Sequence, residues 1–208
     1  MILYVDRFWI SPYVFSCFVA LREKGIAFDT KEVGLDRGDQ KEPDFRARSI
    51  TARVPSLTDG DFSLSESQAI VEYLEDVKPE PALLPRGARD RARARQIMGW
   101  VRSDLDALRE ERPTHTMFYA RATAPLTKAG EAAAAKLVDV ASRLIPDGRT
   151  QLFDAWSIAD ADLAFMLHRL ILNGHDVPAK IRAFAETQWA RPSVAEFVRR
   201  DRPTYVAY

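Results

Sequence analysis

The sequence contains very few cysteine and histidine residues. Cys17 is the only cysteine among 208 residues, so no disulfide can form within the chain and a Cys-x-x-Cys redox pair is excluded. His115, His168 and His175 show no spacing such as His-x-x-x-His, so we expect no bound metal. A lone cysteine suits a reducing compartment, and we therefore expect a cytoplasmic protein.

Long apolar runs and an excess of one charge are also absent. No run of eighteen apolar residues occurs, which predicts no membrane span. The chain opens on the apolar run Ile2 to Val5 and then Asp6, without the basic start of a signal peptide. Basic and acidic residues number 30 each, and this balance argues against a nucleic-acid partner. Apolar residues make up 47%, which is ample for a core.

The composition of the chain changes after its first third. Residues 1–80 mix short strand and helix patterns, whereas 90–208 are almost entirely helix-periodic. Between them, residues 81–89 form the predicted linker. The residues that break regular structure around it are Pro79, Pro81, Pro85 and Gly87.

Apolar spacing predicts several helices in the second region. Ala94, Ile97, Val101, Leu105 and Leu108 recur every three or four residues, which predicts one long helix from Asp90 that ends or kinks at Pro113. Further helices are predicted over 127–144, 157–172 and 178–186, and from Ser193 onward. Ser157 with Asp160, and Ser193 with Glu196, have the spacing of N-terminal caps, whose role is folding stability.

Positive charge gathers where the predicted long helix begins. The helix dipole disfavours cations there, so we expect a solvated face with nearby acids, or else a dimer contact or an anion site. Asp104, further along, is a candidate to reach a ligand amine across a dimer axis. The arginines concerned are Arg86, Arg89, Arg91, Arg93 and Arg95.

The first 80 residues read as two short blocks of strands and helices. The first block is a strand at Ile2–Val5, a helix that opens at Ser11-Pro12 and ends at Lys24-Gly25, and a strand at Phe28–Val33. Ser11 is the expected N-cap of this helix. We expect Cys17, within the helix, to pack as a small apolar side chain.

The second block follows Val54-Pro55. It is a strand at Ser56–Thr58, an Asp59-Gly60 turn, a return strand at Phe62–Leu64, and a helix over Glu66–Glu75 with Ser65 as its N-cap. A helix N-terminus favours an anion.

This order of features resembles the glutathione S-transferase family. The pattern is Val54-Pro55, strand, turn, strand, Glu66-Ser67 and helix, and it is similar to the family's glutathione-binding half. The resemblance covers the whole chain, because the second region is similar to the family's helical domain. It implies an α/β thioredoxin-like N-terminal domain followed by an all-α C-terminal domain.

The resemblance implies that Ser11 is the catalytic residue. A serine-type enzyme would donate a hydrogen bond from Ser11 to the sulfur of glutathione and so favour the thiolate. Two alternatives stay open on the residues alone: Ser11 can act purely as a cap, and the nearby phenol of Tyr13 can contact the sulfur or the substrate instead.

The remaining implied contacts hold the glutathione peptide. A cis Val54–Pro55 bond would present the Val54 backbone to the cysteinyl part, as in an added strand. Ser67 would bind the γ-glutamyl carboxylate, and Glu66 would pair with its ammonium group. The candidates for the glycine carboxylate are Gln40, Lys41 and Arg53.

The resemblance implies a homodimeric transferase that uses glutathione as co-substrate. Its thiolate would attack a small hydrophobic electrophile or a peroxide. The helical domain would supply an apolar pocket, for which the candidate residues are Trp100, Met117, Phe118 and Tyr119. The alternatives are a glutathione-dependent isomerase or peroxidase on the same fold, and a non-catalytic glutathione-binding scaffold.

Overall fold

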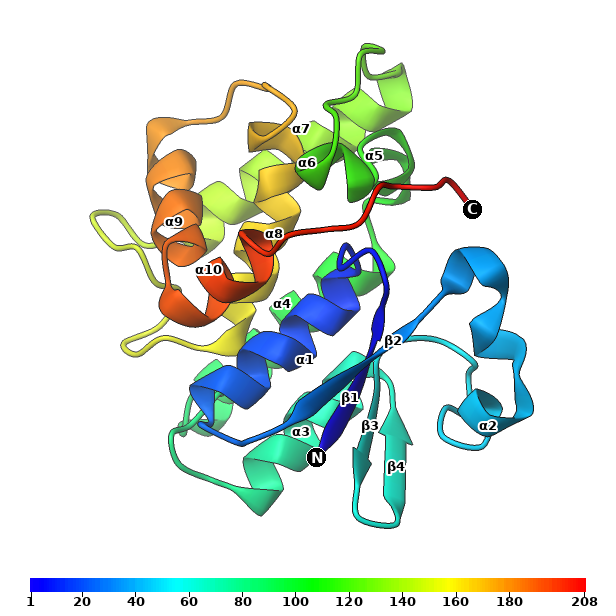
Figure 1. Ribbon diagram of the computed structural model, residues 1–208. Helices are drawn as coiled ribbons and strands as arrows, with labels where there is room; N and C mark the ends of the chain where they lie inside the picture. The colour runs from blue at the N-terminus through cyan, green and yellow to red at the C-terminus, as the bar shows by residue number, and fades with distance from the viewer. The chain divides into compact units, whose positions relative to one another are not determined.

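Four short strands form one mixed sheet in the first part of the chain (Figure 1). In spatial order they are β2 (Asp29–Val33), β1 (Ile2–Asp6), β3 (Ser56–Asp59) and β4 (Phe62–Ser65). β1 and β2 run parallel, whereas β3 is antiparallel to both β1 and β4. The sequence predicted all four strands, each to within one residue at either end.

The computed structural model describes residues 1–208, which divide into two compact units. The first unit comprises Met1–Leu83 together with a C-terminal segment, Arg199–Tyr208. The second unit is Leu84–Val198. The two ends of the chain therefore belong to the same unit.

The position of the C-terminal segment differs from the expectation that residues 90–208 form one domain. Tyr205 packs edge-to-face on Phe8, with 5.2 Å between the ring centroids, and Tyr208 stacks on the same ring at 5.9 Å. These aromatic contacts attach the segment to the first unit, and no periodicity in its sequence signals them.

Helices cover both faces of the sheet in the first unit (Figure 1). α1 (Pro12–Glu23) and α3 (Ser67–Val77) pack together on one face. The short α2 (Pro43–Arg46) lies on the other face, where the Phe45 ring meets Tyr4 with 5.8 Å between the centroids. Two single-turn 3-10 helices precede it: η1 (Leu35–Arg37) and η2 (Asp39–Lys41).

Helix α1 begins as the sequence predicted. Ser11 is its N-cap, and its hydroxyl oxygen accepts a hydrogen bond from the Val14 N–H at 3.3 Å. Pro12 occupies the first helical position, where its missing N–H costs nothing. Cys17 is fully buried, so it packs as the predicted small apolar side chain.

Helix α3 begins one residue later than predicted. Ser65 is not its N-cap, because this residue still pairs with Ser56 in the ladder of β4 and β3. Glu66 takes the N-cap position instead, with a φ of 75° and no capping hydrogen bond from its side chain. The predicted apolar face is confirmed, since Ile70, Val71 and Leu74 are all buried.

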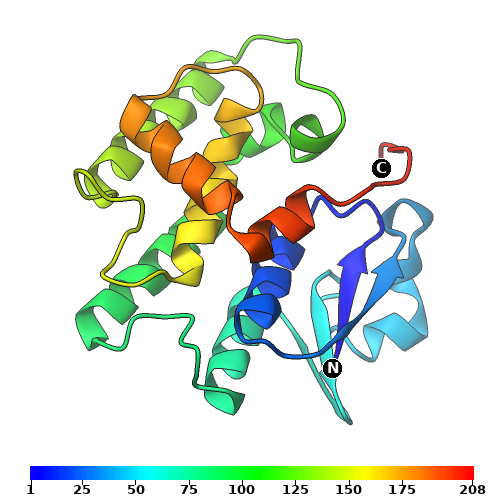
Figure 2. The same ribbon diagram turned by 60° about the vertical axis from the view of Figure 1, so that its left-hand side comes forward.

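The second unit is entirely helical. Its central helix is α8 (Ile158–Ile171), in which every residue from Ile158 to Leu170 is buried. α8 packs against α4, α7 and α9, which surround it in Figure 2. The other helices are α4 (Ala88–Ser103), α5 (Asp106–Glu111), α6 (His115–Phe118), α7 (Lys128–Leu144), α9 (Ala179–Trp189) and α10 (Pro192–Val198).

The predicted cap of the central helix is confirmed. Ser157 and Asp160 form a capping box at the start of α8. The Asp160 carboxylate accepts hydrogen bonds from the Ser157 N–H at 2.8 Å and the Ser157 hydroxyl at 3.1 Å. It also accepts one from the Leu152 N–H at 2.7 Å, so it fixes the preceding loop as well as the helix.

The long helix predicted from Asp90 to Pro113 is wrong, because it is divided into α4 and α5. The chain turns at Leu105, whose φ of 65° lies in the left-handed region. The Asp104 carboxylate accepts a hydrogen bond from the Leu105 N–H at 2.7 Å and stabilises this turn. Leu105 and Leu108 are buried, so the apolar spacing correctly predicted which residues face the core, although it did not predict the break between the two helices.

The cap predicted at Ser193 is also wrong. Helix α10 begins at Pro192, and the Ala195 N–H donates to the Arg191 carbonyl at 2.7 Å, so Ser193 already lies inside the helix. Proline is favoured at the first helical position, which Pro192 occupies here. None of the helices in residues 1–208 is sufficiently long and apolar to cross a membrane.

Candidate functional site

The sheet brings four segments of the first unit to one of its ends. β1 and β2 finish side by side, with Asp6 opposite Val33. β3 starts there, because its first residue Ser56 lies opposite Tyr4 of β1 and opposite Ser65, the last residue of β4. The residues proposed from the sequence lie within or close to these four segments: Ser11, Tyr13, Gln40, Lys41, Arg53, Val54, Glu66 and Ser67.

Ser11 joins the segment after β1 to helix α1. Its hydroxyl oxygen is engaged by the Val14 N–H, which leaves the hydroxyl hydrogen available to a ligand. The residue is half-buried and lies at the positive end of a twelve-residue helix. This arrangement can bind and stabilise an anion such as a thiolate.

Two residues that the sequence reasoning missed shape the approach to Ser11. Asp6 is almost fully buried, and its carboxylate accepts hydrogen bonds from the Ile10 N–H at 2.8 Å and the Ser11 N–H at 3.1 Å. Burial raises the pKa of Asp6, against the lowering effect of these hydrogen bonds. Trp9 has a φ of 53°, which is rare for a residue with a large side chain.

A signal for Asp6 was present in the sequence. An acid that directly follows a buried strand and precedes an N-cap by five residues can reach the free N–H groups of the intervening turn. The positive φ of Trp9 had no such signal, because glycine or asparagine is the usual residue in this conformation.

Tyr13 is the second helical residue of α1 and is half-buried. Its position two residues after Ser11 keeps it a candidate for contact with the same ligand. Tyr4, on β1, is buried at 5% exposure and packs on Phe45, so it belongs to the core.

Val54 presents free backbone groups at the start of β3. Neither its N–H nor its C=O makes a hydrogen bond within the chain, although the residue is only 8% exposed. The Val54–Pro55 peptide bond is cis. The preceding residue, Arg53, is held by the hydroxyl of Ser49. This hydroxyl donates a hydrogen bond to the Arg53 carbonyl at 2.9 Å and accepts one from the Arg53 N–H at 3.2 Å. An extended peptide could pair with such a backbone edge.

Glu66 and Ser67 stand at the N-terminus of α3. Glu66 is exposed, whereas Ser67 is 5% exposed and its carbonyl lies 3.7 Å from the Cys17 sulfur. The hydroxyl of neighbouring Ser65 is buried and has no hydrogen-bond partner. A carboxylate near Glu66 would face a positive helix end, and an ammonium group would face the Glu66 carboxylate.

The three remaining residues differ in their surroundings. Gln40, in η2, has a buried Oε1 atom with no hydrogen-bond partner. Lys41 and Arg53 are exposed, and neither forms an ion pair. Both cations are therefore open to an anionic group.

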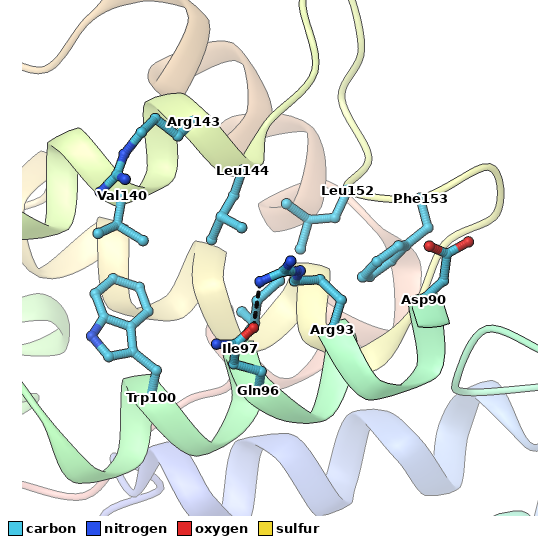
Figure 3. A pocket seen from close by; sticks show the side chains of 10 residues that line it. All are labelled: Asp90, Arg93, Gln96, Ile97, Trp100, Val140, Arg143, Leu144, Leu152 and Phe153. Carbon is cyan, nitrogen blue, oxygen red and sulfur yellow. Dashed lines mark hydrogen bonds between the residues drawn. The ribbon is translucent and has the colours of Figure 1, made fainter. Parts of the chain in front are cut away.

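The second unit contains a separate pocket of about 630 Å³ (Figure 3). It is lined from α4, α7 and the loop after α7 by the apolar side chains of Ile97, Trp100, Val140, Leu144, Leu152 and Phe153, and by the polar ones of Asp90, Arg93, Gln96 and Arg143. Its volume lies within the range of small-molecule sites. Of the predicted lining residues only Trp100 is found here, whereas Met117, Phe118 and Tyr119 belong to or follow α6.

Asp104 is engaged within its own unit. Its carboxylate accepts hydrogen bonds from Lys136 and from the Trp100 indole N–H, the latter at 2.9 Å. The hydrogen bond from Lys136 and the Leu105 N–H lower the pKa of Asp104 to about 2. These contacts do not support the expectation that Asp104 reaches a ligand amine, since its acceptor atoms are already used.

Comparison with known proteins gives two family matches. Residues 7–82 match the N-terminal domain of glutathione S-transferases, and residues 88–202 match the C-terminal domain. A curated relative, glutathione S-transferase Z1 of Arabidopsis thaliana, is 38% identical over 98 residues, which cover 47% of this chain and 44% of the relative. The chain thus spans less than half the length of that relative.

Solved structures match over almost the whole chain. A glutathione transferase homologue from Burkholderia, with bound glutathione, is 40% identical and has a TM-score of 0.77; the match covers 95% of both chains. A maleylacetoacetate isomerase from Methylobacterium extorquens, with bound malonate and glutathione, is 30% identical with a TM-score of 0.74, and covers 95% of this chain and 96% of that one.

Proposed function

The chain belongs to the glutathione S-transferase family, and we propose that it binds glutathione at the end of the sheet and activates the thiol with Ser11. The Ser11 hydroxyl carries this proposal, because its oxygen caps α1 while its hydrogen stays available. Donation of that hydrogen to sulfur, at the positive end of α1, favours thiolate over thiol and lowers the thiol pKa.

The peptide part of glutathione is held by the other segments in this proposal. The free N–H and C=O of Val54 pair with its cysteinyl residue as an added strand would. Ser67, at the start of α3, binds the γ-glutamyl carboxylate, and Glu66 pairs with the ammonium group. Gln40, Lys41 and Arg53 supply the donors for the glycine carboxylate.

The proposed reaction is attack of the thiolate on a small apolar electrophile. A carbon–sulfur bond forms, and the electron pair of the broken bond leaves with the departing group. We assign the electrophile to the helical unit, where the Trp100 pocket and the residues at the end of α6, Met117, Phe118 and Tyr119, are rival contacts. Trp100→Ala and Phe118→Ala separate these two, because only the true contact should raise the KM for the electrophile.

An isomerase is the second candidate function. Relatives at 30% and 35% identity are maleylacetoacetate isomerases, and the first of these was solved with glutathione and malonate bound. In such a reaction the thiolate adds to a conjugated double bond, the new single bond rotates, and elimination returns glutathione unchanged. Consumption of glutathione during turnover separates a transferase or peroxidase from this alternative, and a protein without any turnover would be a binding scaffold.

The assembly in this proposal is a homodimer that joins the first unit of one chain to the second unit of its partner. Two features support it. β4 is an edge strand with Phe62 46% exposed, and the first turns of α4 carry four arginines, of which Arg89, Arg93 and Arg95 are exposed. An unpaired strand edge and a strongly charged helix start are both surfaces that a partner chain can cover.

The test of thiol activation is a pair of substitutions at Ser11. Ser11→Ala removes both the helix cap and the hydroxyl, whereas Ser11→Gly removes the hydroxyl but retains a tolerated N-cap. Both variants should raise the pKa of bound glutathione and lower turnover roughly ten- to hundredfold, while calorimetric affinity for glutathione changes little. Only Ser11→Ala should also lower the free energy of unfolding, by about 0.5–2 kcal/mol.

Ultraviolet titration of the thiolate in the glutathione complex is the deciding measurement. An unchanged thiol pKa and turnover in Ser11→Gly would make Ser11 a cap only. Tyr13→Phe is the matched variant for the rival phenol, and a loss confined to that variant would transfer the role to Tyr13. Absence of glutathione binding up to millimolar concentration in the unaltered protein would refute the proposal as a whole.

A further inference from the structure

The backbone that leads into Ser11 is held in an uncommon conformation. Trp9, two residues earlier, has a φ of 53°, and such a residue keeps this conformation only when its surroundings impose it. Its N–H donates to the Asp6 carbonyl at 3.0 Å, and its indole N–H donates to Glu32 at 3.0 Å. The side chain is 2% exposed.

The side chain of Asp6 holds the two residues that follow Trp9. Its two carboxylate oxygens accept separately from the Ile10 and Ser11 N–H groups. Burial raises the pKa of Asp6, and the positive charge of Arg202 acts in the opposite direction. Arg202 therefore favours the charged form of this carboxylate, though less strongly than the backbone hydrogen bonds do.

The C-terminal segment, residues 199–208, also contacts Trp9. The Arg202 Nε and Nη2 atoms both donate to the Trp9 carbonyl, at 3.2 and 3.1 Å. The Arg200 guanidinium lies 3.6 Å from the centroid of the Trp9 ring, and the Arg200 carbonyl accepts from Arg202 Nη1 at 2.8 Å. Two arginines thus engage the carbonyl and the ring of one residue.

Aromatic contacts attach the same segment to the neighbouring residue. Tyr205 and Tyr208 both pack on the ring of Phe8, which is 1% exposed. The segment consequently meets the turn at two successive residues, Phe8 and Trp9. Several contacts therefore attach the segment to the turn, and those of Arg202 are the ones that reach the backbone of Trp9.

The orientation of the Trp9–Ile10 peptide decides where Ser11 enters α1. The Trp9 carbonyl points to the Arg202 fork, while the next N–H, that of Ile10, points to Asp6. Rotation of this peptide would break both interactions and would move the Ser11 backbone. A catalytic group that shifts by about 1 Å can lose roughly a hundredfold in rate.

We propose that Arg202 is a positioning residue for Ser11, which holds the Trp9 carbonyl and so fixes the turn that places the Ser11 hydroxyl. Its effect on catalysis rests on the proposed function of Ser11. Its effect on the turn does not. Arg202 acts from 191 positions further along the chain than Ser11 and touches no ligand in this scheme.

The first test is amide hydrogen exchange in the full-length protein without ligand. Arg202→Gln should speed exchange at the Ile10 and Ser11 amides roughly ten- to hundredfold, because a charge-assisted fork is lost. Arg202→Lys keeps the charge without the fork and should recover part of the protection. Arg199→Gln is the matched control, since Arg199 is an exposed arginine of the same segment. It should leave exchange unchanged.

The second test measures the glutathione complex of the same three variants. Arg202→Gln should lower kcat about tenfold and raise the bound thiol pKa, with the glutathione Kd within about threefold of the unaltered protein. Unchanged exchange at Ile10 and Ser11 would overturn the inference. So would faster exchange with full turnover and an unchanged thiol pKa. Failure of the unaltered protein to bind glutathione would instead refute the proposed function, while the exchange result would still decide the role of Arg202 in the turn.

Discussion

Glu66 combines an exposed carboxylate with a position at the start of a helix. Its φ of 75° places it at the N-cap of α3, next to the free positive end of that helix. If it pairs with the glutathione ammonium, Glu66→Gln should raise the glutathione Kd about three- to tenfold, a modest effect because the carboxylate is exposed. Isothermal titration calorimetry measures the change.

Asp76→Asn provides the control for that substitution. Asp76 is an exposed acid near the other end of the same helix, so its removal changes the net charge equally without touching the site. Equal weakening in both variants would indicate a general charge effect and would remove Glu66 from the proposed contacts.

Asp160 predicts a specific dependence of stability on pH. Burial raises its pKa from 3.8 to about 6, so the folded state binds the proton more tightly than the unfolded state does. Its contribution is therefore fully present below pH 3.8 and is lost as the pH rises through 6. Relative to Asp160→Asn, which cannot titrate, the unaltered protein should lose on the order of 2–3 kcal/mol of unfolding free energy between pH 4 and pH 7.

Chemical denaturation of both proteins at the two pH values tests this expectation. The difference between them cancels the titration of all other groups. A difference that is constant, or larger at pH 7, would show that the three hydrogen bonds to the Asp160 carboxylate outweigh its burial.

At the scale of elements, the start of α7 is stabilised by its N-cap residue together with Glu111. Thr127 is its N-cap: its hydroxyl accepts from the Gly130 N–H at 3.2 Å and donates to Glu111 at 2.7 Å. Thr127→Ala should lower the free energy of unfolding by about 0.5–2 kcal/mol, as measured in urea. Thr127→Ser keeps the hydroxyl and should recover most of that loss; equal destabilisation by both would exclude the capping role.

Local patterns predicted most of these elements, because strands and helices of the core follow the spacing of their apolar residues. The failures occur where contacts distant in sequence decide the backbone. The division of α4 from α5 depends on Asp104, which Lys136 and Trp100 hold in place to receive the Leu105 N–H. Nothing in the spacing around Leu105 indicates that turn, since the residue is buried as the predicted helix required.

The candidate site was predictable to a similar extent. Ser11 as a cap and the polar residues after Val54 follow from turn and helix-start signals. The role of Asp6 had a local signal that was overlooked, whereas that of Trp9 depends on a positive φ and on the C-terminal segment, neither of which local sequence encodes. Local sequence patterns do not reveal residues such as Arg202, which support the site from a distant part of the chain.

At the scale of the whole molecule, we expect two chains to associate. Sedimentation velocity at micromolar concentration should give a species of twice the 23.5 kDa chain mass. The reason is that the exposed edge strand β4 and the arginine-rich start of α4 offer surfaces that association can cover. A single species of 23.5 kDa across the micromolar range would contradict the dimer while leaving the glutathione site untouched.

The first unit is built from two segments that are far apart in the sequence, and this affects the order in which its parts are synthesised. A ribosome releases residues 1–83 long before it makes the segment 199–208 that completes the same unit. At about 5–20 residues per second, the intervening helices take several seconds to synthesise. During that interval the nascent first unit lacks Arg202, so the turn before Ser11 receives the Arg202 hydrogen bonds only after the whole helical unit has been made.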